Sequence, residues 1–166
     1  MAEESAEQDT VRAGLSEAEM RDNVVRLAFG GDDGRYEHFC AVLREAMPPG
    51  TAAVLRGSAV TGHRHGDNAP FDADGPGTSD LDLTLVGGEA VALYKLDGFF
   101  IPKIHSRPVS EKDPDIAPAL VPLRDRLMTM VGRPVNIQGT RDWIMFFREH
   151  VMGQPYLTLI GKAESA

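Results

Sequence analysis

The sequence predicts an α/β (α+β) fold, with a mixed sheet of about four to five strands flanked by helices. The first observation is size, because 166 residues with 42% hydrophobic content make one ordinary domain with its own core. The second is the alternation of short apolar runs, which are typical of buried strands, with longer amphipathic segments, which are typical of helices. The third is a series of Gly- and Pro-rich breaks between these segments.

The N-terminal part is expected to begin with a flexible acidic leader, residues 1–15. Ser16 and Glu19 have the spacing of a capping box, in which each side chain satisfies a backbone N–H group of the other residue. Apolar residues then recur at helical spacing over 16–29. We therefore expect the folded domain, residues 16–161, to open with a helix.

A second helix begins at Asp32 or Asp33, either of which can cap it, and ends at Pro48. Residues 51–56 are a short apolar run that predicts a buried strand. This strand leads directly into Gly57–Ser58, which we expect to form a turn.

Residues 60–79 are expected to form an inserted loop. They contain four Gly and two Pro and show no apolar period. A loop of this length inside a domain is unusual, and its position between two candidate site elements favours a functional role over disorder. His63, Arg64 and His65 have no Cys partner and no regular ligand spacing, which disfavours a zinc site. Contact of these residues with phosphate or with an acceptor is the better functional hypothesis. The simplest structural interpretation is a solvent-exposed loop.

The second half of the chain continues the alternation of strands and helices. In chain order we expect a strand over 80–86, a short helix over 89–96, extended segments over 99–101 and 103–105, a helix over 114–131, a strand over 134–138, a helix over 141–152 capped by Thr140, a strand over 156–160 and a tail over 162–166.

Asp80 and Asp82 are the leading candidates for a functional site. Side chains two positions apart in a strand point to the same face, so the two carboxylates project together while the intervening leucines face the core. Paired carboxylates favour a divalent cation. Gly57 and Ser58 add backbone N–H groups and a hydroxyl that could bind phosphate.

This combination resembles the polymerase-beta-like nucleotidyltransferase superfamily in its minimal, single-domain form. The matching segments are 55–58, 79–83, 135–137 and 143–160. The resemblance covers roughly residues 33–161, and the first two segments make it specific.

The resemblance implies a transferase that moves a nucleoside monophosphate from a nucleoside triphosphate to an acceptor hydroxyl and releases pyrophosphate. Asp80 and Asp82 would be the catalytic metal ligands for Mg²⁺ or Mn²⁺, and Gly57, Ser58 and Ser79 would bind the nucleotide. ATP is the first donor to consider. The acceptor could be a protein, a small molecule or, less in keeping with the acidic charge, an RNA end.

Asn136 departs from the pattern of the family. Active members usually carry a third carboxylate there, whereas an amide can coordinate a metal through its oxygen but cannot act as a base. Asp72, Asp74 or Asp142 could supply a carboxylate from elsewhere. The alternative is a nucleotide-binding regulatory pseudoenzyme or a toxin–antitoxin component on the same fold. A structural module without a ligand is the third hypothesis.

Composition narrows the choice of partners. The formal net charge of −8 disfavours extended nucleic-acid binding, which needs clustered Lys and Arg. No run approaches the roughly 18 apolar residues of a membrane span, and the acidic N-terminal residues do not have the form of a secretory signal, so we expect a cytoplasmic protein. Little chain is left for an acceptor domain, so a homo-oligomer or a partner protein could complete the site.

Overall fold

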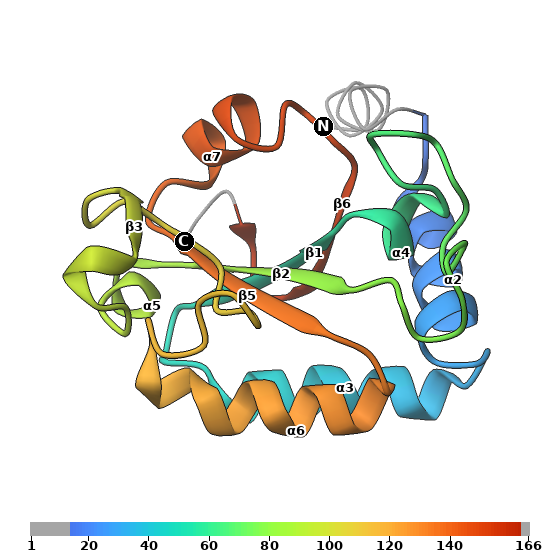
Figure 1. Ribbon diagram of the computed structural model, residues 1–166, viewed down its shortest axis with the longest axis horizontal. Coiled ribbons are helices and arrows are strands. Elements are labelled where there is room, and N and C mark those ends of the chain that lie inside the picture. Colours follow the sequence, from blue (N-terminus) through green and yellow to red (C-terminus); the bar gives the residue numbers. More distant parts are fainter. Residues whose placement is uncertain (1–13, 164–166) are drawn as a thin grey trace.

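Six strands form one mixed sheet in the computed structural model, which describes residues 14–163 (Figure 1). The spatial order is β3-β4-β5-β2-β1-β6. The strands are β1 (Ala52–Arg56), β2 (Leu81–Val86), β3 (Phe99–Ile101), β4 (His105–Ser106), β5 (Val135–Thr140) and β6 (Tyr156–Ile160). The expected mixed sheet flanked by helices is thus confirmed.

The predicted number of four to five strands was wrong, because the extended segments around Pro102 form a hairpin that joins the sheet. Its first strand, β3, pairs with β4, and His105 of β4 pairs with Thr140 of β5. Three and two residues are too few to carry a period-2 pattern, so pairing with β5 creates strands that the local sequence does not specify.

The helices connect these strands and cover the sheet. They are α2 (Glu17–Ala28), α3 (Asp33–Ala46), α4 (Ser58–Thr61), α5 (Gly88–Val91), α6 (Val121–Val131) and α7 (Trp143–Glu149), with short 3-10 turns η1 (Leu96–Gly98) and η2 (Pro118–Leu120). Among the described residues, no helix is long and apolar enough to cross a membrane.

Local capping explains where α2 and α3 begin. Ser16 Oγ accepts a hydrogen bond from Glu19 N at 3.1 Å, and Glu19 Oε2 accepts one from Ser16 N at 3.4 Å, so the predicted capping box is confirmed. Asp32 caps α3 by accepting from Arg35 N at 3.1 Å. Residues 1–13 of the predicted leader and 164–166 of the predicted tail lie outside the described residues.

Three predicted helix boundaries needed correction. Thr140 is part of β5, and Asp142 instead caps α7, where its Oδ1 accepts from Met145 N at 3.0 Å. The helix expected over 114–131 begins as the 3-10 turn η2 and becomes α-helical only at Val121. The helix expected over 89–96 is limited to α5, Gly88–Val91.

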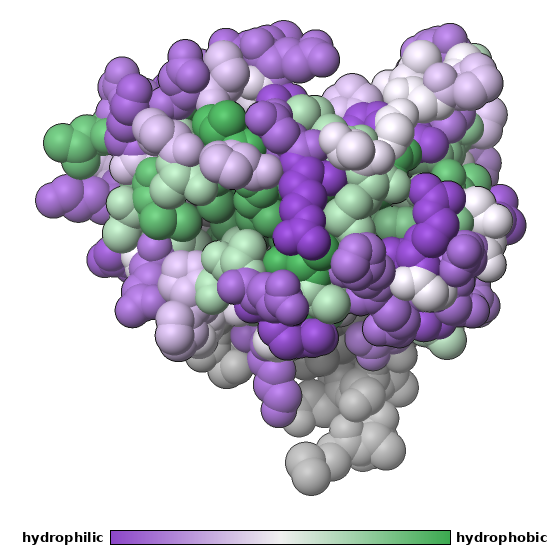
Figure 2. All heavy atoms as spheres, turned by 90° about the horizontal axis from the view of Figure 1, so that it is seen from below, coloured by the Kyte–Doolittle hydropathy of each residue, from purple (hydrophilic) through white to green (hydrophobic). Residues whose placement is uncertain are grey.

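The two faces of the sheet pack against different cores. Leu81, Leu83 and Leu85 of β2 join the larger core, which also contains buried side chains of α2, α3 and α6. Figure 1 shows α3 and α6 side by side along this face of the sheet, and Figure 2 shows hydrophilic side chains interspersed with hydrophobic ones on the outer surface below them. Trp143 and Phe146 of α7 pack with residues of β1, β2 and β6 in a smaller core.

Alternation along β2 therefore turns Asp82 away from the larger core. Asp82 pairs in register with Arg56 of antiparallel β1 and with Asn136 of parallel β5. Since side chains of paired residues project from the same face, three polar side chains lie in a row across three neighbouring strands. Here α7 covers part of the same face, and this polar row occupies the edge where β1 ends and β2 and β5 begin.

Candidate metal and nucleotide site

Asp80, Asp82 and Asn136 come together in the structure. Asn136 Nδ2 donates hydrogen bonds to Asp80 Oδ2 at 2.7 Å and to Asp82 Oδ1 at 3.1 Å. Asp80 lies just before β2, and the parallel register of β2 and β5 brings Asn136 beside it. Three of the residues that the sequence analysis assigns to the site, Asp80, Asp82 and Asn136, therefore lie in direct contact.

The environment of Asp82 disfavours its negative charge. Burial is the main cause that raises the pKa of its carboxyl, and the nearby charge of Asp80 adds to it. The Arg56 guanidinium and the hydrogen bond from Asn136 act in the opposite direction but do not cancel the shift. Two carboxylates held together in this way would gain from a cation.

Arg56 is a site residue to which sequence reasoning gave no role. Its Nη2 donates to Gln138 Oε1 at 3.0 Å, and its guanidinium carbon lies 5.9 Å from the centre of the Phe146 ring. Gln138 is held in turn by its own donation to Ser106 O at 2.7 Å. The sequence feature that could have identified Arg56 is its position as a basic residue at the end of β1, immediately before the Gly57–Ser58 turn.

Gly57 of the turn after β1 lies close to the Asp82 carboxylate. It precedes α4 with φ +94° and ψ −161°, a conformation that favours glycine. A Cβ atom at this position would lie 3.2 Å from Asp82 Oδ2. Ser58 follows as the first residue of α4, and its hydroxyl makes no hydrogen bond within the described part of the chain.

Asp72 does not supply the third carboxylate. It forms a bidentate ion pair with Arg133, in which Nη1 lies 2.8 Å from Oδ1 and Nη2 lies 3.1 Å from Oδ2. Arg133 also stacks over the ring of Phe71, 4.4 Å from its centre. The guanidinium is the main cause that lowers the pKa of Asp72 to about 2.

The other two alternatives are also engaged elsewhere. Asp74 forms an ion pair with Arg64, with 2.6 Å between Oδ2 and Nη1. Asp142 caps α7 on the part of the sheet face that this helix covers. Asn136 is therefore the side chain that occupies the position next to both aspartates.

Ser79 belongs to the anchor of the inserted loop. Its hydroxyl accepts a hydrogen bond from Asp72 N at 2.8 Å, its N–H donates to Asp72 Oδ1 at 3.0 Å, and its carbonyl accepts from Arg133 Nη1 at 2.9 Å. These contacts fix the backbone immediately before Asp80. A direct contact of Ser79 with nucleotide stays a prediction.

The donor set suits a hard cation with oxygen ligands. Within residues 14–163 no group of three His, Cys, Asp or Glu side chains could hold a metal ion. Asp80 and Asp82 offer carboxylate oxygens, and a half-turn of the Asn136 amide would present its Oδ1 in place of Nδ2. Mg²⁺ and Mn²⁺ accept such ligands and complete their coordination with water or phosphate oxygens.

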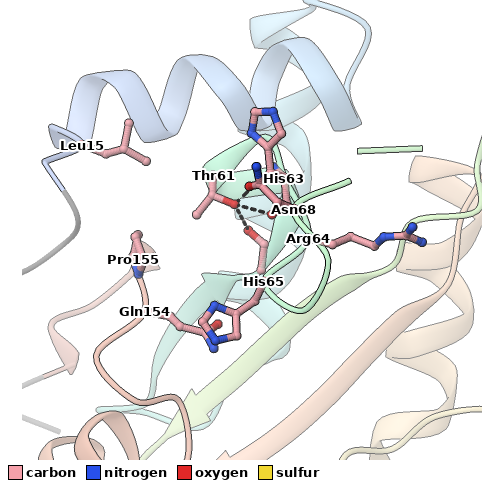
Figure 3. Close-up of a pocket in the computed structure, with 9 residues that line it drawn as sticks. Leu15, Thr61, His63, Arg64, His65, Asn68, Gln154 and Pro155 are labelled. Atoms are coloured by element: carbon pink, nitrogen blue, oxygen red, sulfur yellow. Dashed lines mark hydrogen bonds between the residues drawn. The ribbon is translucent and has the colours of Figure 1, made fainter. Parts of the chain in front are cut away.

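Two cavities flank this constellation. One of about 360 Å³ is lined by Asp80 and Asn136 together with residues of the 108–112 segment. The other, of about 400 Å³, adjoins Gly57 and is walled by the inserted loop (Figure 3). A ligand at the carboxylates could therefore extend in two directions.

The backbone around the first cavity is tied to the sheet. Val109 N donates to Ile137 O at 2.8 Å, and Ile137 N donates to Val109 O at 3.1 Å. The 108–112 wall is thus fixed relative to Asn136, which immediately precedes Ile137.

Comparison of the chain with protein-family models, curated proteins and solved structures gives no match.

Proposed function

We propose that the protein is a nucleotidyltransferase that uses Mg²⁺ or Mn²⁺ to move a nucleoside monophosphate from a nucleoside triphosphate to an acceptor hydroxyl, with release of pyrophosphate. The observation that carries this proposal is the convergence of Asp80, Asp82 and Asn136 beside the Gly57–Ser58 turn. These are also the positions at which the sequence resembles the polymerase-beta-like superfamily.

Asp80, Asp82 and the Asn136 oxygen would hold the metal. When bound there, it would supply positive charge to the phosphates and to the oxygen atoms on which charge develops during phosphoryl transfer. Its own charge would also relieve the repulsion between the two carboxylates, which agrees with the raised pKa of Asp82.

The turn and the neighbouring cation would position the phosphate chain. Gly57 has no side chain between its backbone and the carboxylates, so a phosphate can approach the main chain closely. The Ser58 hydroxyl can donate to a phosphate oxygen. Arg56 partly balances the charge of Asp82 from the neighbouring strand, and its bond to Gln138 keeps it there.

The acceptor would enter from the cavity of about 360 Å³ beside Asp80 and Asn136. This volume lies at the lower end of the range of small-molecule sites. Asp80 lines this cavity and also belongs to the carboxylate pair, so an acceptor hydroxyl bound there would lie next to the proposed reaction centre. A protein side chain and a small molecule are both compatible with this opening.

A second candidate function is nucleotide binding without turnover, as in a regulatory pseudoenzyme or a toxin–antitoxin component. Asn136 favours it, because an amide adds no negative charge to the site and cannot accept the acceptor's proton as a carboxylate can. The two candidates share the same ligand and the same residues, and they differ in whether product forms.

The test measures pyrophosphate release from each nucleoside triphosphate, ATP first, with Mg²⁺ or Mn²⁺ and a panel of protein and small-molecule acceptors. The control is Asp80→Ala/Asp82→Ala, which should abolish release. Release that persists in this double variant would refute the assignment. Calorimetry that detects metal-dependent nucleotide binding, with no product after long incubation, would favour the second candidate.

A further inference from the structure

The cavity beside Gly57 is built largely by residues outside the motifs used so far. It lies between the inserted loop, the segment before β6 and Leu15, which precedes the N-cap of α2 (Figure 3). Figure 3 shows His65 next to Gln154, with Pro155 and Leu15 along the adjoining wall. The inserted loop thus contributes directly to a space that begins at the proposed phosphate turn.

The described residues that line this cavity include basic and amide side chains but no acidic one. The chain has a formal net charge of −8, yet none of the described residues that line the cavity is acidic. His63 and His65 offer imidazole N–H groups, and Asn68 and Gln154 offer carboxamide N–H groups. A wall with N–H donors and no carboxylate favours an anionic ligand.

Two carboxylates of the same loop are directed to an arginine and not to the cavity. Arg64 forms ion pairs with Asp67, with 2.9 Å between Nη2 and Oδ2, and with Asp74, with 2.6 Å between Nη1 and Oδ2. Figure 3 shows that the Arg64 side chain leads away from His65 and Gln154. Arg64 itself lines the cavity, and its guanidinium is engaged with the loop's own carboxylates; His63 and His65 are the other basic residues of the lining.

Backbone hydrogen bonds give this part of the loop a defined shape. Arg64 N donates to Ala69 O at 2.7 Å, and Asn68 N donates to Arg64 O at 3.0 Å. At the base of the loop, Phe71 N donates to Gly62 O at 3.0 Å. The donors that line the cavity therefore project from a structured wall.

We propose that this cavity receives the terminal phosphates of the nucleoside triphosphate, with His65 and Gln154 as specificity-determining donors. The proposal rests on the proposed function, in which Gly57 and Ser58 hold the phosphate chain. Since Gly57 also lines the cavity, phosphates that extend beyond the turn enter it. The site then prefers triphosphates to monophosphates, and inorganic tripolyphosphate is itself a ligand.

The experiment is calorimetric titration, in the presence of Mg²⁺, of ATP, AMP and inorganic tripolyphosphate into the wild type and its variants. His65→Glu should weaken the binding of ATP and tripolyphosphate by about tenfold or more, because a carboxylate repels the terminal phosphates, and should leave AMP binding unchanged. Gln154→Ala should weaken the same two ligands to a smaller extent. His38→Glu is the matched control, since His38 is an exposed histidine on α3, and it should change none of the affinities.

The outcomes separate this proposal from the proposed function. If the wild type binds ATP and Asp80→Ala/Asp82→Ala does not, but His65→Glu and Gln154→Ala bind ATP normally, the cavity proposal is overturned and the proposed function stands. An equal loss of ATP and AMP affinity would also overturn it, because the cavity would then hold the nucleoside. Absence of ATP binding by the wild type with Mg²⁺ and with Mn²⁺ would overturn both. Thermal melting of each variant checks that the fold is intact.

Discussion

At position 136 an asparagine amide and an aspartate carboxylate would have opposite effects on the neighbouring carboxylates. The Asn136 amide donates to Asp80 and Asp82 and holds the two carboxylates together through its own N–H groups. A carboxylate at the same place would repel both of them in the absence of metal, and with metal it would add a charged ligand. The residue therefore favours the metal-free fold and lacks the third carboxylate that the resemblance leads us to expect in an active transferase.

We predict that the Asn136→Asp variant melts at a lower temperature than the wild type in EDTA. Millimolar Mg²⁺ should raise the melting temperature of the variant above its own value in EDTA. The loss comes from two missing hydrogen bonds and one added negative charge, and the gain comes from a third charged ligand, which should strengthen Mg²⁺ binding by about tenfold. Differential scanning calorimetry with and without Mg²⁺ measures both effects. An Asn136→Asp protein whose stability does not respond to Mg²⁺ would contradict the metal assignment.

Gly57 is the second residue whose identity follows from its neighbours. We predict that Gly57→Ala costs roughly 1–3 kcal/mol of stability, because alanine is strained at φ +94° and its Cβ would meet Asp82 Oδ2 at 3.2 Å. Nucleotide binding should be lost at the same time. Gly66→Ala is the matched control within the inserted loop, since a Cβ there has no atom within 4 Å. Urea unfolding of the two variants gives the comparison, and equal midpoints would argue against a constrained turn.

At the scale of the elements, the inserted loop is attached to the body of the protein next to the site. Arg133 follows the end of α6 and binds Asp72, and Asp72 in turn binds the backbone N–H groups of Gly77 and Ser79. The Arg133 side chain is 8% exposed and the Asp72 side chain 22%, so the ion pair is shielded from water on most sides. This attachment fixes the direction in which the chain enters β2.

We predict that Arg133→Met destabilises the protein by about 2 kcal/mol at neutral pH. The Asp72 pKa of about 2 against an ordinary 3.8, at about 1.36 kcal/mol per pH unit, sets the upper limit of this loss: Arg133 is the largest cause of the shift, and the backbone N–H groups of Ser79 and Gly77 supply a smaller part. Because the folded-state pKa is depressed, this contribution is fully present above about pH 4 and is lost as the pH falls through 2. Urea unfolding at neutral pH measures the loss, and limited proteolysis should detect new cleavage within 62–78.

The control for this experiment is Arg64→Met. Its ion pairs with Asp67 and Asp74 are solvent-exposed, so little change in stability is expected. Adding Asp72→Asn to Arg133→Met should restore part of the lost stability, since it removes the unpaired carboxylate. If the two arginine variants unfold at the same urea concentration, Arg133 has no special role in attaching the loop.

The limits of sequence reasoning are visible in the same elements. Strands β1, β2 and β6 and helices α2 and α3 could be predicted because their apolar periods and caps are local. The pairing of Asp72 with Arg133 could not, because the residues lie 61 positions apart and Asp72 adopts a left-handed conformation with φ +59°. Asn136 reached the site through resemblance, since spacing alone does not say that β5 pairs with β2.

Two elements were misjudged for a physical reason that the chain does not carry locally. Thr140 and Asp142 can both cap a helix, but Thr140 is held in β5 by its pairing with Val86 of β2 and with His105 of β4. The hairpin of β3 and β4 likewise depends on β5 as a template. Tertiary pairing decided these boundaries over local propensity.

On the scale of the whole molecule, a buried histidine links the sheet to the small core. His105 is 0% exposed, its Nδ1 lies 2.6 Å from Thr140 Oγ1, and its Nε2 has no hydrogen-bond partner among the described residues. Burial is the main cause that lowers its pKa below 6.5, and the neighbouring His150 lowers it further, whereas Asp142 and Glu149 raise it. The folded protein therefore resists protonation of this ring.

We predict that acid weakens the fold through His105. Since its folded-state pKa is depressed, the unfolded chain binds a proton more readily below about pH 6.5, and stability falls as the pH decreases from 7.5 to 5.5. His105→Asn, which keeps an N–H donor toward Thr140 but cannot titrate, should flatten the pH dependence of the urea midpoint. The exposed His38→Asn should keep the wild-type slope. Equal slopes in all three proteins would exclude His105 as the cause.

The closed base of the inserted loop has a consequence for how this chain could change. Residues 63–70 are joined at their ends by an isolated bridge between His63 and Pro70, and the stretch behind them is held separately by Arg133. Residues between His63 and Pro70 could therefore be replaced without moving Asp80 or Asp82, because the His63–Pro70 bridge closes this segment and the Asp72–Arg133 ion pair holds the chain that follows it. Ligand preference could then diverge, in evolution or in the laboratory, while the carboxylate centre is inherited intact.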